Sequence, residues 1–385
     1  MSGEFVFLEA EQFVRYGGWE LDQQSMDQMG SPYLLAHGLG IPVEDAETTI
    51  SFPSPGNYRL WVRTRDWVAP WKAPGAPGKF QVLINGTPAK EIFGTKGENW
   101  HWHDGGIISV DSKAKIALHD LTGFEGRCEA LLFCKDTGFI PVNDVKALTK
   151  FRRQLLGFPE KPVEGGYFDL AGAGGGLAGV CAALSAARHG LRVALIQDRP
   201  VLGGNCSSEV RVWPEGHTRQ EPFPHIGDIV EEIVPDLAES KNGSKNALRS
   251  FVYDDKRKLD VVKKEKGITL LLQQRVIDVQ HANNKIEAVI VQHIQSGEQK
   301  RISASLFADC TGDATVGYLA GADFEMAAAN IMGISNLWNI LDVADTKEVL
   351  DCDCKDKTAL TMSCKIGKIE QPFPRCPWAI DLSDK

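Results

Sequence analysis

The sequence lacks the excess of positive charge on which sequence-independent nucleic-acid binding depends. Its 42 Lys and Arg residues are outnumbered by 51 Asp and Glu residues, which gives a net charge of −9. Because such binding needs clustered basic side chains that neutralise phosphates, we expect no nucleic-acid partner. The chain also lacks an opening basic segment followed by an apolar core. We therefore predict no signal peptide and, unless the chain has been trimmed, a cytoplasmic location.

Long apolar segments are scarce as well. The segment from Leu170 to Ala187 carries no charged residue and approaches the length that spans a bilayer. It is rich in Gly and Ala, however, and poor in the Leu and Ile residues that drive membrane insertion. We therefore interpret it as a strand, turn and helix of a soluble domain, and we expect no membrane association.

The cysteines follow no regular framework, and the sequence contains neither an internal repeat nor a low-complexity run. An odd total of nine cysteines favours reduced thiols over a disulfide scaffold. Four of them fall in the last 34 residues, at Cys352, Cys354, Cys364 and Cys376. Their C-x-C start differs from the C-x2-C spacing of zinc knuckles, so loop or core thiols are favoured and no metal site is predicted.

The pattern of the sequence changes near residue 150. Before this point, short segments alternate apolar and polar residues between Gly and Pro turns, as at residues 58–63, 80–84 and 115–118. Alternation with a period of two predicts antiparallel strands and hairpins. Many short strands without long helices indicate a β-sandwich. After residue 166 the pattern becomes strand, glycine turn, small-residue helix and strand, which is typical of an α/β domain.

The predicted fold is therefore multidomain, with an N-terminal antiparallel β-sandwich followed by an α/β Rossmann-like domain. We expect the sandwich over residues 1–150 and a basic, Pro-containing linker over residues 151–166. The α/β domain is expected over residues 167–330. Residues 331–385 would form the start of a substrate domain or a truncated tail.

Tryptophan is concentrated in the predicted sandwich. Six of the nine tryptophans lie in the first 102 residues, namely Trp19, Trp61, Trp67, Trp71, Trp100 and Trp102. Exposed indoles can stack on sugar rings, whereas buried ones would fill the core or the seam with the next domain. The segment, with Glu9-Ala10-Glu11 and Gly17-Gly18-Trp19, resembles the sandwich modules that accompany carbohydrate-active bacterial enzymes. That resemblance implies a carbohydrate-binding module or a docking module.

The strongest motif of the chain is a glycine run between two predicted strands. A buried strand over residues 167–173 leads into Gly174-x-Gly176-x-x-Gly179, a helix follows to Gly190, and a second strand covers residues 191–196. In this spacing Gly174 permits the tight turn and Gly176 lets the backbone approach a pyrophosphate. Gly179 allows the helix to pack closely on the strand, and the N-terminus of the helix faces the phosphates. The sequence therefore predicts a dinucleotide site.

The residue expected to bind the adenosine ribose departs from the usual pattern. An acidic residue normally ends the second strand, about twenty positions after the glycines. Here Gln197 occupies that place, and Asp198 follows it. Gln also forms hydrogen bonds with ribose hydroxyls, so we retain Gln197 and Asp198 as candidates.

The residues after the second strand indicate which dinucleotide is bound. Arg199 is followed by Leu202-Gly203-Gly204-Asn205, which resembles the bacterial FAD-dependent oxidoreductases of the glutathione-reductase-like superfamily. The resemblance implies that the Gly203-Gly204 backbone lies along the FAD diphosphate and approaches the flavin, and Asn205 is a candidate cofactor-binding residue of the same segment.

A second set of residues carries the same resemblance. Residues 267–272 with Arg275-Val276 resemble the strand and adjoining residue whose backbone meets the adenine, and Val276 is a candidate contact. Residues 304–314 resemble the second cofactor signature of the family, a strand that ends in Asp309-x-Thr311-Gly312-Asp313. Asp309, Thr311, Gly312 and Asp313 are accordingly candidate FAD-binding residues.

The resemblance implies an FAD-dependent oxidoreductase that acts on a small-molecule substrate, with a sugar as one candidate. His217 and His225 are candidate bases and Cys206 a candidate redox thiol, although solvated or packed roles suit each of them as well. Two alternatives stay open: a redox-cofactor-dependent sugar-cleaving enzyme, and a non-catalytic glycan-binding protein derived from a truncated flavoenzyme. Members of the family usually continue well beyond this length and carry a late Gly-Asp segment, so we expect the chain to be a truncated form.

Overall fold

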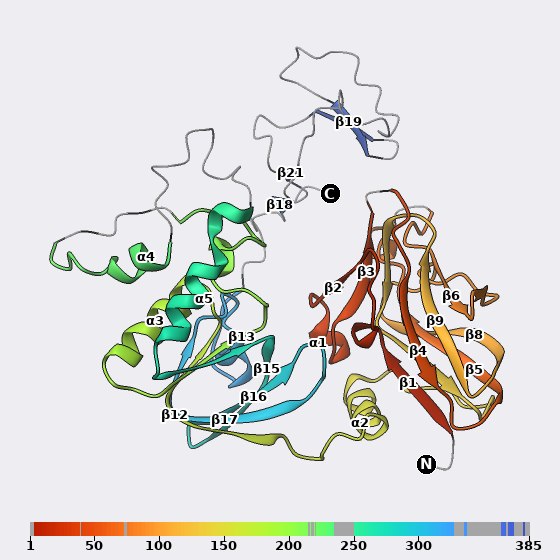
Figure 1. The fold of residues 1–385 in the computed structure, drawn as a ribbon, viewed down its shortest axis with the longest axis horizontal. Coiled ribbons are helices and arrows are strands. Elements are labelled where there is room, and N and C mark those ends of the chain that lie inside the picture. The colour runs from red at the N-terminus through yellow and green to blue at the C-terminus, as the bar shows by residue number, and fades with distance from the viewer. Residues whose placement is uncertain are drawn as a thin grey trace.

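The computed structural model describes residues 4–38, 40–72, 75–214, 216, 219, 221–234 and 250–326, together with four short strands. These strands are β18 (Ser335–Asn336), β19 (Ser363–Ile366), β20 (Ile369–Pro372) and β21 (Ile380–Asp381). The main described part forms two lobes joined through helix α2 (Val145–Leu155), as Figure 1 shows. Within the described residues no helix is long and apolar enough to cross a bilayer. The side chains of the four C-terminal cysteines, and His217, lie outside the described residues.

The N-terminal lobe is built from three antiparallel sheets. The first has the order β1 (Phe5–Glu9), β11 (Ala130–Cys134), β5 (Gly56–Thr64) and β8 (His101–Val110). The second has the order β10 (Phe124–Cys128), β3 (Tyr33–His37) and β2 (Trp19–Asp22). The third has the order β4 (Ala46–Ser51), β9 (Lys113–Asp120), β6 (Phe80–Ile84) and β7 (Thr87–Pro88).

A single apolar core joins these sheets. The three strands expected at residues 58–63, 80–84 and 115–118 lie within β5, β6 and β9. In β6, buried residues alternate with half-buried ones, which is the period-two pattern that one core-facing side of a strand requires. The core cluster includes Leu60 and Ile116, both fully buried.

Most of the tryptophans in this lobe are structural. Trp19, Trp61, Trp100 and Trp102 are buried. Trp61 and Trp102 pack against Leu148 and Phe151 of α2, at the seam between the sheets and the helix. Trp71 differs from them because 62% of its surface is exposed.

The second lobe is centred on a six-stranded mixed sheet. Its order is β14 (Ile268–Leu272), β13 (Val193–Gln197), β12 (Val163–Ala173), β17 (Gln299–Asp309), β16 (Lys285–His293) and β15 (Gln274–Ala282). The first four strands are parallel, and the last two pair antiparallel. Strand β12 begins inside the segment expected to be a linker, and α2 crosses the expected boundary at residue 150.

Helices cover this sheet because its central strands are apolar on both sides. Val193 and Leu195 of β13 join one buried cluster with Val180 of α3 (Leu177–Arg188), whereas Ala194 and Ile196 join another. Alternate residues of a strand face opposite sides, so both faces of β13 are buried. Among the residues that the structure describes, this lobe also contains α4 (Asp228–Ile233), α5 (Asp255–Lys264) and α6 (Thr315–Leu319).

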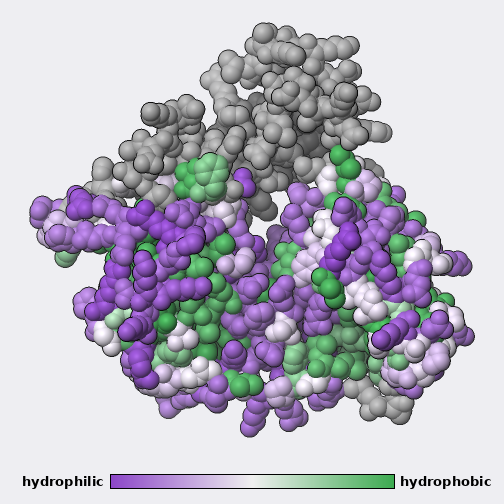
Figure 2. Space-filling view, in the orientation of Figure 1, coloured by the Kyte–Doolittle hydropathy of each residue, from purple (hydrophilic) through white to green (hydrophobic). Residues whose placement is uncertain are grey.

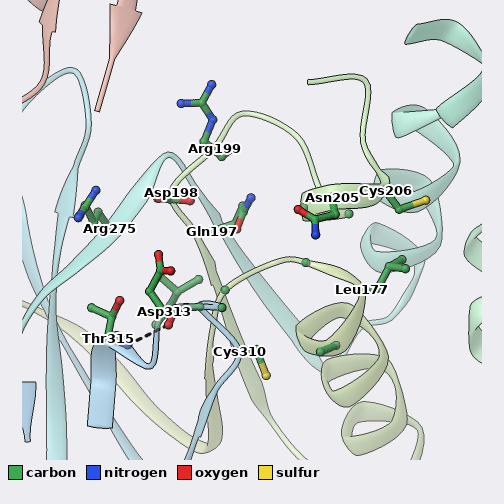
Figure 3. Close-up of a pocket in the computed structure, with 18 of the residues that line it drawn as sticks. Leu177, Gln197, Asp198, Arg199, Asn205, Cys206, Arg275, Cys310, Asp313 and Thr315 are labelled. Atoms are coloured by element: carbon green, nitrogen blue, oxygen red, sulfur yellow. Dashed lines mark hydrogen bonds between the residues drawn. The ribbon is translucent and has the colours of Figure 1, made fainter. Parts of the chain in front are cut away.

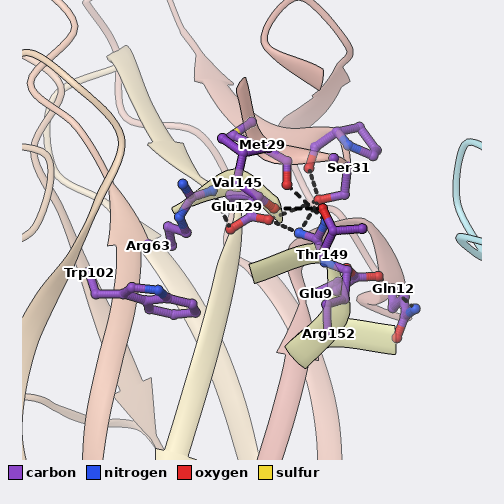
Figure 4. A network of polar contacts seen from close by, with 12 residues as sticks. Glu9, Gln12, Met29, Ser31, Arg63, Trp102, Glu129, Val145, Thr149 and Arg152 are labelled. Atoms are coloured by element: carbon purple, nitrogen blue, oxygen red, sulfur yellow. Dashed lines mark hydrogen bonds and ion pairs between the residues drawn. The ribbon is translucent and has the colours of Figure 1, made fainter. Parts of the chain in front are cut away.

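A buried ionic network holds α2 to the N-terminal lobe (Figure 4). Arg152 lies with its Nε 2.5 Å from Glu9 Oε1, and its Nη2 pairs with Glu129. The same guanidinium donates to Ser31 Oγ at 2.7 Å and to the carbonyl of Met29 at 3.0 Å. Burial alone would lower the pKa of Arg152, but the carboxylates of Glu9 and Glu129 outweigh it and raise that pKa. Arg152 therefore stays charged inside the lobe.

Glu11 belongs to the same network, but few polar groups stabilise its buried carboxylate. Both of its carboxylate oxygens are buried and lack a hydrogen-bond partner among the described residues. Burial, and then the neighbouring Glu9, raise the pKa of Glu11 well above its ordinary value. A carboxyl whose pKa is raised by folding stabilises the fold fully below its unfolded pKa, and this contribution is lost as the pH rises through the folded pKa.

We therefore expect Glu11→Gln to stabilise the protein at pH 7–8 by about 1 kcal/mol, because folding at that pH must otherwise either bury an ionised carboxylate or take up a proton. Near pH 4 the variant and the parent should have similar stability, since Glu11 is then protonated. Urea unfolding at a series of pH values from about 4 to 8 measures the difference. A difference that does not change with pH would contradict the assignment of the raised pKa to Glu11.

Candidate functional site

Three glycines in the turn between β12 and α3 and in the first turn of α3 have distinct structural roles. Gly174 has a φ of +99°, and a Cβ there would lie 2.2 Å from the carbonyl oxygen of Cys310. A Cβ on Gly179 would lie 1.8 Å from the carbonyl oxygen of Gly174. Gly176 has an ordinary extended conformation, and its Cβ would meet only the Cα of Gly204 at 3.9 Å. The first and last glycines are therefore required by the fold, whereas Gly176 leaves space free that a side chain would fill.

A second glycine pair faces this turn. Gly203 N donates to the carbonyl of Gly175 at 2.8 Å, and Gly203 forms an isolated parallel bridge with Gly176. Gly203 and Gly204 both have positive φ, at +112° and +57°. The two turns therefore present bare backbone toward each other.

These turns line a cavity of about 530 Å³ at the carboxyl ends of β12, β13 and β17. Figure 3 shows the side chains around it. The N-cap residue of α3 is Gly176, which has no side chain to cap the first turn, and Leu177 and Ala178 of that turn also line the cavity. Uncapped N–H groups at a helix N-terminus favour an anion, so the glycine-lined end of the cavity is suited to phosphate. The carboxyl edge of a parallel sheet is also where α/β folds place their ligands.

Most of the expected cofactor residues line this cavity. They are Gly174, Gly176, Gln197, Asp198, Arg199, Gly203, Gly204, Asn205, Val276, Thr311, Gly312 and Asp313. Gly179 and Asp309 are not among the lining residues. Their positions relative to a bound cofactor remain predictions.

Gln197 is held by the glycine turn. Its buried side chain accepts a hydrogen bond from Gly175 N at 2.7 Å and donates one to the carbonyl of Val201 at 3.0 Å. Among the described residues, the neighbouring Asp198 carboxylate has no hydrogen-bond or ion-pair partner. At this corner of the cavity Asp198 is therefore the carboxylate left available to a ribose.

Asp309 stabilises the turn that carries Thr311, Gly312 and Asp313. One carboxylate oxygen accepts from Thr311 N at 3.1 Å and Thr311 Oγ1 at 2.7 Å, and the other accepts from the backbone N–H groups of Val316 and Gly317. Burial raises the pKa of Asp309, but these hydrogen bonds outweigh burial and the net pKa is lowered. Asp309 thus remains ionised and positions the turn, while Asp313 lines the cavity.

The candidate bases and thiol are placed differently from one another. His225 is exposed and outside the cavity lining, with Nδ1 3.0 Å from Asp228 Oδ2. Cys206 lines the cavity, but it is only 1% exposed and burial raises the pKa of its thiol. A raised pKa reduces the thiolate that redox chemistry needs, so the packed interpretation suits Cys206 better.

Residues outside the sequence-based set also line the cavity. They are Leu177, Ala178, Ile196, Val212, Trp213, Pro214, Gln274, Arg275, Cys310 and Thr315. Leu177 and Ala178 were within reach of sequence reasoning because they follow the last phosphate-facing glycine. No sequence motif predicts that Trp213 lines the cavity, because the position of its loop depends on tertiary packing.

The N-terminal lobe touches the rim of this cavity. Gln23 donates to the backbone carbonyl of Asp198 at 3.1 Å. Asp27, on α1 (Met26–Met29), pairs with Arg275 at 2.8 Å. Residues of the N-terminal lobe therefore contact cavity-lining residues of the second lobe.

Comparison with known proteins gives one family match. The profile of the family described as FAD dependent oxidoreductase matches residues 169–372, just over half of the chain. No curated protein matches the chain.

Among solved structures, a family 35 carbohydrate binding module from Clostridium thermocellum is 18% identical, with 34% of this chain and 96% of that one covered and a TM-score of 0.27. A geranylgeranyl bacteriochlorophyll reductase-like protein from Thermoplasma acidophilum is 19% identical, with coverages of 40% and 42% and a TM-score of 0.29. THI4 from Thermovibrio ammonificans is 20% identical, with coverages of 50% and 72% and a TM-score of 0.31. The chain thus spans less than half the length of the reductase-like protein.

Proposed function

The chain belongs to the family of FAD-dependent oxidoreductases, whose cofactor is FAD, and we propose that the cavity between its two glycine turns is where FAD binds. The observation that carries this placement is the space in front of Gly176, which the fold does not need and which a single Cβ would begin to fill. We further propose a Rossmann-like arrangement of the glutathione-reductase type for this lobe and a β-sandwich for the N-terminal lobe.

The residues around the cavity fit the parts of FAD in a definite order. The diphosphate would meet the uncapped N-terminus of α3 and the backbone of Gly203 and Gly204. Asp198 would bind the adenosine ribose, because Gln197 is already engaged by the glycine turn. Asp313 and Asn205 would face the ribityl chain and the flavin side.

When bound, FAD would supply the redox chemistry by accepting or donating electrons at its flavin ring. The residues of this chain would orient it and exclude water. The overall reaction we propose is the oxidation or reduction of a small-molecule substrate by an FAD-dependent oxidoreductase. We propose that the substrate approaches from the side of Asn205 and Pro214, which also line the cavity.

A second candidate function concerns the N-terminal lobe. The exposed indole of Trp71 lies edge-on to Trp67, with ring centroids 5.9 Å apart, and Arg127 stacks on Trp67. An exposed indole beside polar groups supports sugar binding, so we propose a carbohydrate as the ligand of this surface. A sugar substrate for the cavity would then explain why the two lobes occur in one chain.

The absorption spectrum of the purified full-length protein tests the main proposal. Flavin bands near roughly 370 and 450 nm, present on purification or restored by added FAD, are the expected result. A colourless protein that does not bind added FAD would refute the placement of FAD in the cavity. If such a protein still bound glycans, the non-catalytic alternative would hold. Turnover of a sugar without net consumption of an oxidant would instead indicate cofactor-dependent sugar cleavage.

A further inference from the structure

A lysine is buried directly behind the second glycine turn. Lys258, on α5, is completely buried, and its Cε would lie 2.8 Å from a Cβ built on Gly203. Its Nζ donates to the carbonyl of Tyr253 and lies 4.0 Å from Asp255 Oδ1. That same oxygen of Asp255 accepts a hydrogen bond from Ser208 N at 3.0 Å. The side chain therefore lies on one side of Gly203, with the cavity on the other.

Few polar groups stabilise the buried ammonium group of Lys258. An ammonium group has three donors, and the described residues supply one hydrogen bond and one carboxylate at the limit of an ion pair. Taking an ammonium ion out of water costs several kcal/mol unless it is well paired. Burial accordingly lowers the pKa of Lys258, and the neighbouring Cys206 and Asp255 oppose that shift only in part. A methionine or leucine would fill the same space without that cost, so packing alone does not account for a lysine here.

The other basic side chains around the cavity already have partners. Arg199 forms two hydrogen bonds with Glu209, at 2.8 and 3.0 Å. Arg275 pairs with Asp27 of the N-terminal lobe. Both are thus largely neutralised by their carboxylates. Lys258 is the cation that the structure places against the Gly203 backbone.

We propose that Lys258 attracts the diphosphate of the bound dinucleotide through the backbone of Gly203 and Gly204, so that its buried charge complements the N-terminus of α3 on the opposite side. This inference rests on the proposed placement of FAD. A buried charge close to the anion is poorly screened by solvent and salt, and its effect is therefore stronger than that of an exposed charge. The methylene stem of Lys258 also supports Gly203, and Lys258 is in this sense a positioning residue.

The structure supplies a matched control on the same helix. Lys256 lies two residues earlier, its side chain is 81% exposed, and it pairs with Asp260. Figure 2 shows a mainly hydrophilic surface over α4 and α5, where this residue lies. Lys256→Met and Lys258→Met remove the same charge from the same helix, one from the surface and one from behind the glycine turn.

The test measures the binding of ADP and of adenosine to the flavin-free full-length chain by calorimetry. ADP contains the diphosphate and adenosine does not, so the comparison separates an electrostatic effect from a general distortion of the site. We expect Lys258→Met to weaken ADP binding about tenfold and to change adenosine binding less than about twofold. Lys256→Met should change neither affinity. Lys258→Gln, which keeps an N–H donor for the Tyr253 carbonyl, should weaken ADP binding as Lys258→Met does.

Four results would overturn the proposal. The first is an unchanged ADP affinity in Lys258→Met, and the second is an equal loss for ADP and adenosine. The third is a loss in Lys258→Met that Lys258→Gln fully restores, since the hydrogen bond and not the charge would then matter. The fourth is failure of both variants to fold, which would make the residue purely structural. Parent protein that binds neither ADP nor FAD would instead refute the proposed function itself.

Discussion

Gly176→Val is expected to abolish FAD binding while the protein remains folded. The backbone at Gly176 is extended, with φ −66° and ψ 179°, a conformation that a β-branched residue adopts without strain. Within the described part of the chain, a Cβ on Gly176 has one neighbour closer than 4 Å, the Cα of Gly204 at 3.9 Å, so the fold itself has room for a side chain. That room is where the diphosphate would lie. Displacing a phosphate from backbone N–H groups should weaken FAD binding at least about 100-fold.

Two other glycines provide the controls for this experiment. Gly172→Ala, in β12, places a Cβ in ordinary contact at 3.9 Å and outside the cavity lining, so flavin content should be unchanged. Gly179→Ala places a Cβ 1.8 Å from the carbonyl of Gly174 and should destabilise the fold. Flavin content and Kd from fluorescence quenching, together with the midpoint of thermal unfolding, distinguish the three variants. If Gly176→Val retained its affinity for FAD, the diphosphate would have to lie elsewhere.

The glycine turn could be predicted from the sequence because its geometry is local. Gly174, Gly176 and Gly179 lie within six residues, and the steric requirement of each depends on its immediate strand and helix. The second turn at Gly203-Gly204 could be predicted only through a resemblance to a family. Its role as the opposite wall arises from a hydrogen bond and a bridge to residues nearly thirty positions earlier.

Roles that depend on side-chain direction were harder to predict. Gln197 occupies the expected ribose position, yet its amide is engaged by Gly175 and Val201, which leaves the carboxylate of Asp198. Asp309 is predicted to contact the cofactor, which stays a prediction, and its carboxylate also stabilises the turn before α6. In both cases the motif predicts where the residue lies in the chain. The direction of its side chain depends on the nearby backbone donors and acceptors, which the motif does not reveal.

Buried charges gave no sequence signal at all. Lys258 lies in a helix whose other lysines are mostly exposed, and no periodicity separates it from them. Arg152 lies in a segment whose basic, Pro-containing composition suggested a linker. Its partners are Glu9, Ser31 and Glu129, which are distant in sequence and converge only when the first sheet and α2 have packed. Such contacts can be identified only from the tertiary structure.

Arg152→Met is expected to lower the free energy of unfolding by about 3–5 kcal/mol, the usual cost of removing one partner of a buried ion pair. The loss is large because Glu9 and Glu129 would remain buried without their cation, while the carbonyl of Met29 and the hydroxyl of Ser31 would lose a donor. Urea unfolding of the full-length chain followed by tryptophan fluorescence is a suitable measurement, because Trp61 and Trp102 pack against α2.

Arg153→Met is the matched control, since Arg153 is the next residue of the same helix and donates to the carbonyl of Pro159. Arg153 is half-buried and lies over the ring of Phe158, but it pairs with no carboxylate among the described residues, so we expect this variant to cost about 1 kcal/mol, well below the loss in Arg152→Met. Adding Glu9→Gln to Arg152→Met should recover part of the loss, because one of the stranded charges is then removed. Equal effects of the two arginine variants would show that the lobe tolerates uncompensated carboxylates. A large loss with partial recovery would show that α2 is bound to the N-terminal lobe through this charge, so that the boundary of the lobe lies after Leu155.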